Sequence, residues 1–447
     1  MSQAHYLILV LLLSVLFIIF MTAKIKMHAF FVLIIAALGV GVLAGLNPDS
    51  IISSVKQGFG NTLGAIGIVI VAGTSLGVVL EKTGAAVSMA DFILRRVGKK
   101  NTSLAMSLTG LIFGIPIFCD SGFVVLSPLN KSLAVRSNTS MAVMAVSLGT
   151  SLLAVHCFIP PHPGATAAAG IVGVDLGQLM MVGLIIAIPT AAIGFLWANT
   201  FGSRYNIADS YNTNIEEQIF DNQNLPNPYL SFIPVFVPIV LIALKSILSL
   251  FIKKLTNGFL FRAIIFIGDP SVALLIGLII SFTLIRNWKK EILDKWLGEG
   301  VKNAGSILAI TAAGGAFGTI LKATGVGISI GNMLSPLGLG ILLPFLIAAG
   351  LKTAQGSSTV AIITASSLIL PLLPQLHLNT GWGPILTVLS MGAGSIVVSH
   401  ANDSYFWVVT KFSDLNLETS LKVFTTATLL MGIAAELIIY IVSIFLI

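Results

Sequence analysis

The stretch Gly114-Ile-Pro-Ile-Phe-Cys-Asp-Ser-Gly122 interrupts an otherwise apolar segment of the chain. The apolar runs on its two sides are each shorter than the roughly 20 residues that a helix needs to cross a bilayer. Between them lie a proline, a carboxylate, a hydroxyl and a glycine. Two short apolar arms around a polar, helix-breaking tip predict a re-entrant hairpin over residues 104–135. Such irregular backbone persists at membrane depth only where protein or a water-filled cavity surrounds it.

The composition of the whole chain is that of a helical membrane protein. Of its 447 residues, 56% are hydrophobic and 9% are charged, whereas soluble domains average about 25% charged residues. The first apolar run, residues 6–20, has neither a basic segment before it nor a small-residue cleavage site, so we interpret it as a membrane helix and not as a signal peptide. The net charge of +7 is explained by Lys and Arg in cytoplasmic loops, and no nucleic-acid partner is expected.

The apolar segments predict ten membrane helices, two of them interrupted by polar residues or prolines, and a second hairpin. The helices are expected at residues 5–23, 28–46, 60–80, 141–172 (interrupted), 178–199, 230–252, 263–285, 304–321, 383–410 (interrupted) and 423–446. The second hairpin is expected at about residues 338–373, and short interfacial helices are expected at residues 85–97 and 326–335.

Three motifs recur in the same order in the two halves of the chain. Gly77-Val-Val-Leu-Glu-Lys-Thr-Gly84 is matched by Gly318-Thr-Ile-Leu-Lys-Ala-Thr-Gly325. The tip at Asp120 is matched by Gln355-Gly-Ser-Ser-Thr359, and the interruption that begins at His156 is matched by His400-Ala-Asn-Asp-Ser404. We therefore predict two repeats, residues 1–200 and 230–447, joined by a polar linker at residues 201–229.

The number of crossings sets the orientation of these repeats. Each holds five membrane helices and one hairpin, and an odd number of crossings inverts the second repeat relative to the first. If the N-terminus lies outside, most of the 24 Lys and Arg residues fall in cytoplasmic loops, in agreement with the positive-inside rule. Inverted repeats with interrupted helices that meet at the midplane are typical of a secondary transporter.

The two tips carry the first candidate binding groups. Asp120 is an ionisable group at membrane depth, where it is costly unless paired or hydrated; it is either a site for a proton or a substrate hydroxyl, or a cap of the helix that follows. Ser121 and Gly122 open that helix, whose N–H groups are suited to a carboxylate. The second tip offers three hydroxyls, either to an anion or polyol or as ordinary helix caps: Ser357, Ser358 and Thr359.

The first interrupted helix contains His156-Cys-Phe-Ile-Pro-Pro-His-Pro-Gly164. Its prolines remove backbone donors and free carbonyl groups, which together with His156 and His162 are suited to lining a substrate path. The alternative is that the prolines only shape a kink and that His156 is a core histidine. A histidine pair without a third ligand does not predict a metal site.

The second interrupted helix places an imidazole, an amide, an acid and a hydroxyl between apolar flanks. These groups belong to His400, Asn402, Asp403 and Ser404. A solvated loop is the alternative, but both flanks have the composition of membrane segments. We expect substrate contacts from the last three of these residues and from His156. Proton coupling is expected at Asp120 or Asp403, with His156 or His400 as the next candidates.

Other function classes find less support in the sequence. A membrane-embedded hydrolase lacks a nucleophile, a base and an orienting group in a convincing set, so no catalytic residue and no cofactor are expected. A channel lacks the ring symmetry of a selectivity filter. The sequence leaves open sodium in place of proton coupling, a monomer or a homo-oligomer, and the role of Glu436.

Four motifs together resemble the gluconate permease (gluconate–proton symporter) family. They are Phe118-Cys-Asp-Ser-Gly-Phe123, Val155-His-Cys-Phe-Ile-Pro-Pro-His-Pro-Gly164, Gln355-Gly-Ser-Ser-Thr-Val-Ala361 and Ser399-His-Ala-Asn-Asp-Ser404. The resemblance covers essentially the whole chain. It implies a multi-pass protein of the bacterial inner membrane that imports gluconate or a related sugar acid with protons. It also implies the ion-transporter superfamily, in which substrate lies between two hairpin tips and two unwound helices. The family includes permeases for D-serine and other hydroxy acids, which are the alternative substrates.

Overall fold

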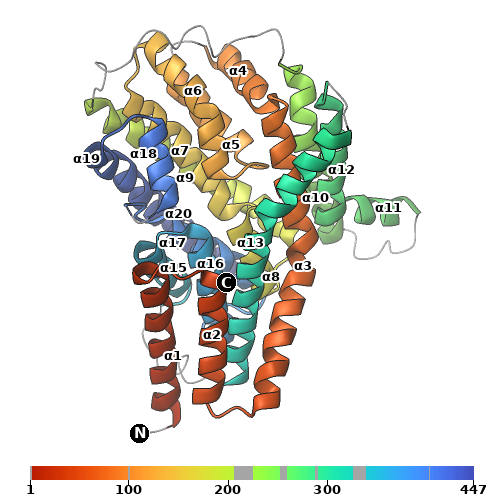
Figure 1. The fold of residues 1–447 in the computed structure, drawn as a ribbon, viewed down its shortest axis with the longest axis vertical. Coiled ribbons are helices and arrows are strands. Elements are labelled where there is room, and N and C mark those ends of the chain that lie inside the picture. Colours follow the sequence, from red (N-terminus) through yellow and green to blue (C-terminus); the bar gives the residue numbers. More distant parts are fainter. Residues whose placement is uncertain are drawn as a thin grey trace.

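The computed structural model describes residues 3–98, 101–205, 225–251, 259–286, 290–325, 339–401 and 403–447, and these residues form helices, turns and loops (Figure 1). The prediction of an all-helical polytopic membrane protein is confirmed. Three predicted features lie outside the described residues: Asn402, the short helix at residues 326–335, and residues 206–224 of the polar linker.

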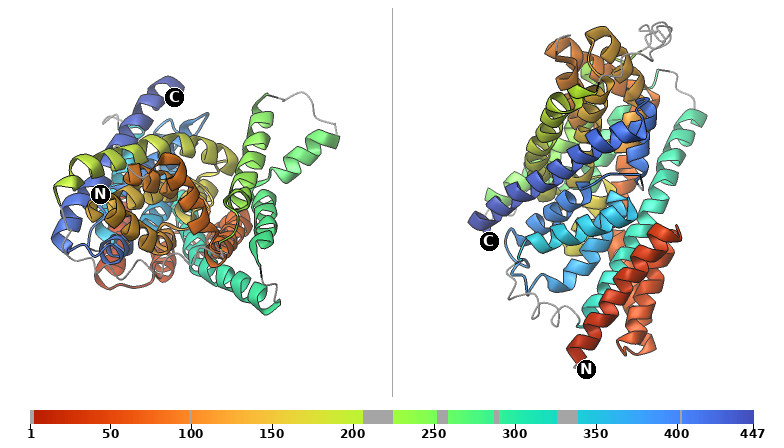
Figure 2. Two further views of the ribbon diagram at one scale, coloured as in Figure 1. Left: turned by 90° about the horizontal axis from the view of Figure 1, so that it is seen from above. Right: turned by 90° about the vertical axis from the view of Figure 1, so that its left-hand side faces the viewer.

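The helices follow one another in a similar order in the two halves of the chain. The first half contains α1 (Gln3–Ile19), α2 (Ala29–Leu43), α3 (Pro48–Lys82), α4 (Ala85–Val97), α5 (Thr102–Phe113), α6 (Cys119–Ser137), α7 (Met141–Phe158), α8 (Pro163–Val172) and α9 (Leu176–Thr200). The second half contains α10 (Pro228–Phe251), α11 (Phe259–Ile267), α12 (Pro270–Ser281), α13 (Lys290–Ala323), α15 (Leu342–Gln355), α16 (Ser358–Ile369), α17 (Gly383–Ile396), α18 (Ser404–Phe412), α19 (Leu417–Ser420) and α20 (Thr426–Leu446). Helix α11 stands away from the remainder of the fold (Figure 2).

Seven spans in the described residues are long and apolar enough to cross a membrane, or eight if the bent pair α11–α12 counts as one. Of the ten expected helices, those at residues 28–46 and 263–285 do not meet this criterion, and the one at residues 383–410 is interrupted as predicted. Helix α2 has only 15 residues, and α17 has 14 and ends just before Val398, whose φ is 52°. Helices α11 and α12 meet at a bend of 70°, because Asp269 caps a new helix that begins at Pro270.

The two longest helices, α3 and α13, pack along each other (Figure 1). They have 35 and 34 residues, a length of about 50 Å. Small residues allow the close approach, since a Cβ atom added to Gly58 would lie 2.8 Å from the Cα atom of Ala316. The glycines of these helices serve close packing, because a Cβ atom on Gly77 would lie 2.8 Å from the carbonyl oxygen of Pro116 in the first tip. A Cβ atom on Gly318 would meet the Cα atom of Ser367 in α16 at 3.2 Å.

Two helical hairpins and two helix breaks occupy the places that the polar motifs indicate. Helices α5 and α6 are joined by residues 114–118, and α15 and α16 are joined by Gly356 and Ser357. Gly356 has a φ of 84°, a left-handed conformation that ends α15 at little cost for glycine. The breaks are residues 159–162 between α7 and α8, and the segment after α17 that leads to α18. These four interruptions position the candidate site.

Candidate functional site

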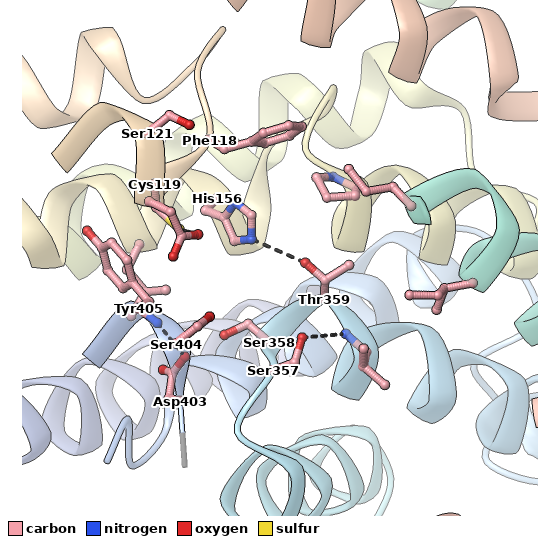
Figure 3. A pocket seen from close by; sticks show the side chains of 16 residues that line it. Phe118, Cys119, Ser121, His156, Ser357, Ser358, Thr359, Asp403, Ser404 and Tyr405 are labelled. Carbon is pink, nitrogen blue, oxygen red and sulfur yellow. Dashed lines mark hydrogen bonds between the residues drawn. The ribbon is translucent and has the colours of Figure 1, made fainter. Parts of the chain in front are cut away.

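One cavity of about 300 Å³ lies where the two hairpin tips and the two helix breaks meet. Phe118, Cys119 and Ser121 approach it from one side, and the second tip and residues 403–405 face them from the other side (Figure 3). Eight of the residues predicted for the site line this cavity: Asp120, Ser121, His156, Ser357, Ser358, Thr359, Asp403 and Ser404. The polar motifs of both halves of the chain therefore contribute to a single cavity.

The first tip presents the start of α6 to the cavity. Helix α6 begins at Cys119, and its first backbone hydrogen bond runs from the N–H of Gly122 to the carbonyl oxygen of Phe118 at 2.8 Å. The N–H groups before Gly122 have no partner within the helix, as at any helix start. Gly122 itself is buried and does not line the cavity; a Cβ atom on it would lie 3.1 Å from Leu152. Gly122 therefore allows α6 to pack closely against α7 and does not contact a ligand in the cavity.

The carboxylate of Asp120 faces the cavity with few partners. Its Oδ2 atom accepts a hydrogen bond from the Cys119 thiol at 3.5 Å, and no ion pair joins it to another described residue. No Lys or Arg occurs among the described residues that line the cavity. The first tip thus presents to whatever enters a carboxyl group without a counterion among the described residues.

The hydroxyls of the second tip are partly used by the fold. The Ser357 side chain accepts a hydrogen bond from the N–H of Val360 at 3.3 Å and so caps α16. The Ser358 hydroxyl donates to the carbonyl oxygen of Ser395 in α17 at 2.9 Å. The Thr359 hydroxyl lies 3.3 Å from Nε2 of His156. Each hydroxyl still lines the cavity, and Thr359 joins the second tip to the first helix break.

The two histidines of the first break have different positions. His156 lines the cavity through α7 and is 7% exposed, and its Nδ1 atom has no hydrogen-bond partner in the described part of the chain. His162 does not line the cavity; its Nε2 atom lies 2.5 Å from the carbonyl oxygen of Gly114. The two rings are 4.9 Å apart between centroids. His162 therefore holds the first tip, whereas His156 is accessible to a ligand in the cavity.

The second break is centred on Asp403. Its Oδ2 atom accepts hydrogen bonds from the Lys352 ammonium at 2.6 Å and from the Ser399 hydroxyl. Its Oδ1 atom accepts from the N–H of Tyr405 at 3.0 Å, which caps α18. Lys352 also donates to the carbonyl oxygen of Gly356 at 2.7 Å. This lysine thus ties the end of α15 and the second tip to the second break.

His400 does not line the cavity. Its Nε2 atom lies 3.1 Å from the carbonyl oxygen of Thr353 in α15. Of the four polar residues predicted in this break, Asp403 and Ser404 are at the cavity wall.

A sequence profile of the GntP family permeases matches residues 6–445 of the chain. The chain belongs to the GntP family of permeases. The gluconate permease of Pseudomonas aeruginosa is 34% identical over 451 residues, which cover 99% of this chain and 99% of that protein. The D-serine transporter DsdX of Escherichia coli is 31% identical over 440 residues, which cover 97% of this chain and 98% of that protein. The L-idonate transporter of the Gnt-II system of Escherichia coli is 31% identical over 413 residues, or 91% and 92% of the two chains.

Two solved structures share the fold. The YdaH transporter of Alcanivorax borkumensis superposes with a TM-score of 0.66 over 94% of this chain and 98% of that chain, at 14% sequence identity. MtrF of Neisseria gonorrhoeae superposes with a TM-score of 0.61 over 94% and 96%, at 16% identity. The resemblance found in the sequence motifs is therefore confirmed, and this GntP permease is a multi-pass membrane transporter and not an enzyme.

Sequence reasoning missed several contributors to the cavity of this GntP permease. Ile307 and Ile310 reach it from α13, where no polar residue marks them. Tyr405 lines it as well, and its hydroxyl donates to the carbonyl oxygen of Gly149 at 2.9 Å. The most consequential omission is the ion pair of Lys352. A lysine three residues before a polar tip in an apolar segment is the signal that could have revealed it.

Proposed function

We propose that this GntP permease is a proton-coupled secondary transporter of the bacterial inner membrane that imports gluconate or a related sugar acid. The observation that carries the proposal is the meeting of two hairpin tips and two helix breaks at one cavity. Its volume of about 300 Å³ is suited to a small metabolite. The gluconate and L-idonate transporters among the relatives support a sugar acid as the substrate.

The substrate carboxylate would contact the helix starts at the two tips. The first turns of α6 and α16 present N–H groups to the cavity, and the positive end of each helix dipole favours an anion. The hydroxyls of the substrate would contact Ser404, His156 and the carboxylate of Asp403, with Asn402 as a further partner proposed from the sequence. A monovalent anion held by N–H groups and hydroxyls, without direct contact to an arginine, is bound weakly enough to be released.

We further propose that the two halves of the chain are inverted repeats. Helices α3 and α13 have nearly equal lengths, and each precedes a hairpin and then an interrupted helix. The repeats would span residues 1–200 and 230–447, with the polar linker between them. Transport would move the group of helices that carries both tips relative to the remaining helices, which is the way such transporters expose a site alternately to the two sides.

Counterflow in proteoliposomes tests this function. Liposomes loaded with unlabelled D-gluconate are expected to take up labelled D-gluconate faster than empty liposomes that contain the same amount of protein. An enzyme would show no exchange, and a channel would show no acceleration by internal substrate. The absence of counterflow with gluconate, L-idonate and other sugar acids would overturn the proposal.

The alternative substrate is D-serine or another small hydroxy acid. The unpaired carboxylate of Asp120 favours it, because an ammonium group would neutralise that charge, and a D-serine transporter is among the relatives. A competition panel of sugar acids and D-amino acids against labelled gluconate uptake separates the two classes. Uptake of labelled D-serine that sugar acids do not inhibit, together with no uptake of labelled gluconate, would select the alternative.

A further inference from the structure

The ion pair of Lys352 and Asp403 differs from the other ion pairs among the described residues in its burial. Its side chains are 1% and 4% exposed, whereas in every other pair at least one side chain is more than a third exposed. A buried lysine and a buried aspartate at 2.6 Å are each costly alone and compatible with the interior only together. The charge of either residue therefore depends on that of its partner.

The hydrogen bonds around Asp403 favour a charged carboxylate. Its two oxygens accept from three donors: the Lys352 ammonium, the Ser399 hydroxyl and the N–H of Tyr405. A proton on the carboxyl group would remove the charge that the buried Lys352 ammonium requires as its partner. Asp403 is thus held in its ionised form by the surrounding donors.

Asp120 has the opposite surroundings. It is partly buried at the cavity, and the described partner of its carboxylate is the Cys119 thiol on its own helix. The titratable groups that face it are His156 from α7, Asp403 at the N-cap of α18, Tyr405 from α18, and Lys352 of α15 behind Asp403. The Tyr405 hydroxyl is directed to a backbone carbonyl, and the one cation in this set is already paired. Asp120 therefore has no counterion among the described residues.

We propose that Lys352 is a positioning residue that keeps Asp403 permanently charged and paired, and that Asp120 is the cavity carboxylate that binds the transported proton. The inference rests on the proposed function and assigns proton coupling to one of its two acidic candidates. With Asp120 charged, the cavity carries a net negative charge and repels a substrate carboxylate. With Asp120 protonated, the cavity is neutral and accepts the anion, so that proton and anion enter together.

The same arrangement predicts that the pH dependence of binding differs between an anionic and a zwitterionic substrate. A zwitterionic amino acid carries an ammonium group that takes the place of the proton at Asp120. Binding of a sugar acid is therefore expected to weaken as the pH rises, by up to about tenfold per pH unit for one bound proton. The affinity for D-serine is expected to stay constant over the pH range in which its ammonium group is charged.

A double-mutant cycle on the purified protein tests the ion pair without any substrate. Lys352→Met and Asp403→Asn are each expected to lower the midpoint temperature of thermal unfolding by several degrees, and the double variant is expected to lose less than the sum of the two. If neither single variant folds, recovery of a folded double variant supports the pair, and failure of the double variant overturns it. A double variant whose midpoint temperature falls by the sum of the two single losses also overturns the ion pair. The matched control is Lys245→Met with Asp269→Asn, a pair at 3.1 Å with a half-exposed aspartate, for which the losses are expected to be small.

Asp120→Asn tests the assignment of the proton. Because Asn mimics the protonated acid, the variant is expected to show measurable although slower counterflow of labelled D-gluconate and no accumulation driven by a pH gradient. Its gluconate affinity, from thermal shifts of the purified protein, is expected to be the same at pH 5.5 and pH 8. Gradient-driven accumulation by the variant, or loss of gluconate binding at both pH values, overturns the proposal. If the wild-type protein does not bind gluconate at all, the proposed sugar-acid substrate fails, while the substrate-free cycle still decides the ion pair and D-serine replaces gluconate in the pH comparison.

Discussion

The imidazole of His156 and the hydroxyl of Thr359 lie 3.3 Å apart, although 203 residues separate them in the chain. His156 belongs to the break in the first half, and Thr359 belongs to the tip in the second half. The contact closes one wall of the cavity (Figure 3). Nothing in the sequence itself indicates that these two motifs, one in each half of the chain, are in contact.

Replacing Thr359 with Val is expected to weaken gluconate binding. The change removes the partner of His156 Nε2 and leaves both ring nitrogens of a buried histidine without a hydrogen bond. A lost hydrogen bond of this kind corresponds to about a tenfold higher half-saturation concentration. Thr364→Val in the same helix is the control, because the buried hydroxyl of Thr364 has no partner among the described residues. Equal half-saturation in wild type and Thr359→Val would argue against a role of this contact in binding.

Replacing Gly77 with Ala is expected to displace the first tip. The new Cβ atom would lie 2.8 Å from the carbonyl oxygen of Pro116, so the backbone must shift. We expect a loss of about 1–3 kcal/mol in stability and a corresponding fall in uptake. Gly67→Ala in the same helix serves as the comparison, because a Cβ atom there meets nothing within 4 Å. Both variants are compared at matched expression, and identical uptake would contradict the packing role of Gly77.

Glu436 in α20 is expected to be replaceable by an apolar residue. It is 3% exposed, and neither carboxylate oxygen has a partner with hydrogen-bond geometry in the described part of the chain. The Ser390 hydroxyl donates to the carbonyl oxygen of Ile341 instead. Glu436→Met should therefore raise the free energy of unfolding by about 1–2 kcal/mol. Glu418→Gln at an exposed position should change it little. A destabilised Glu436→Met protein would show that the carboxylate has a partner in the membrane.

The inverted arrangement of the two halves is tested by the sidedness of two exposed positions. In the inverted arrangement, Ser203→Cys is accessible to a membrane-impermeant maleimide from the cytoplasm, and Thr380→Cys is accessible from the opposite side. Both positions are exposed, whereas Cys119 and Cys157 are buried, so the background labelling should be low. Labelling in intact cells and in inverted vesicles gives the comparison. Accessibility of both positions from one side contradicts the inverted repeats.

Polar residues in apolar segments made much of the site predictable from the sequence. Asp120, the prolines after His156 and the hydroxyls around Ser358 are each costly within a membrane helix, so their positions indicated tips and breaks. The glycines at positions 77 and 318 belong to the repeated motif, and the structure places both where helices or tips approach closely.

Three features were missed, and one of them, the partner of Lys352, depends on tertiary contacts. The partner of Lys352 lies 51 residues away, and only the fold brings the second hairpin against the second break. The full lengths of α3 and α13 were underestimated, because each continues past its most apolar part into a polar end that a hydropathy pattern excludes. The bend between α11 and α12 was missed because a single helix was expected at residues 263–285.

The most direct test of the account is accumulation of labelled D-gluconate by proteoliposomes under an imposed pH gradient. With an acidic exterior, the wild-type protein is expected to raise the internal concentration above the external one, and a protonophore should abolish the effect. Gluconate that enters only to equilibrium, with or without the gradient, would contradict proton-coupled transport.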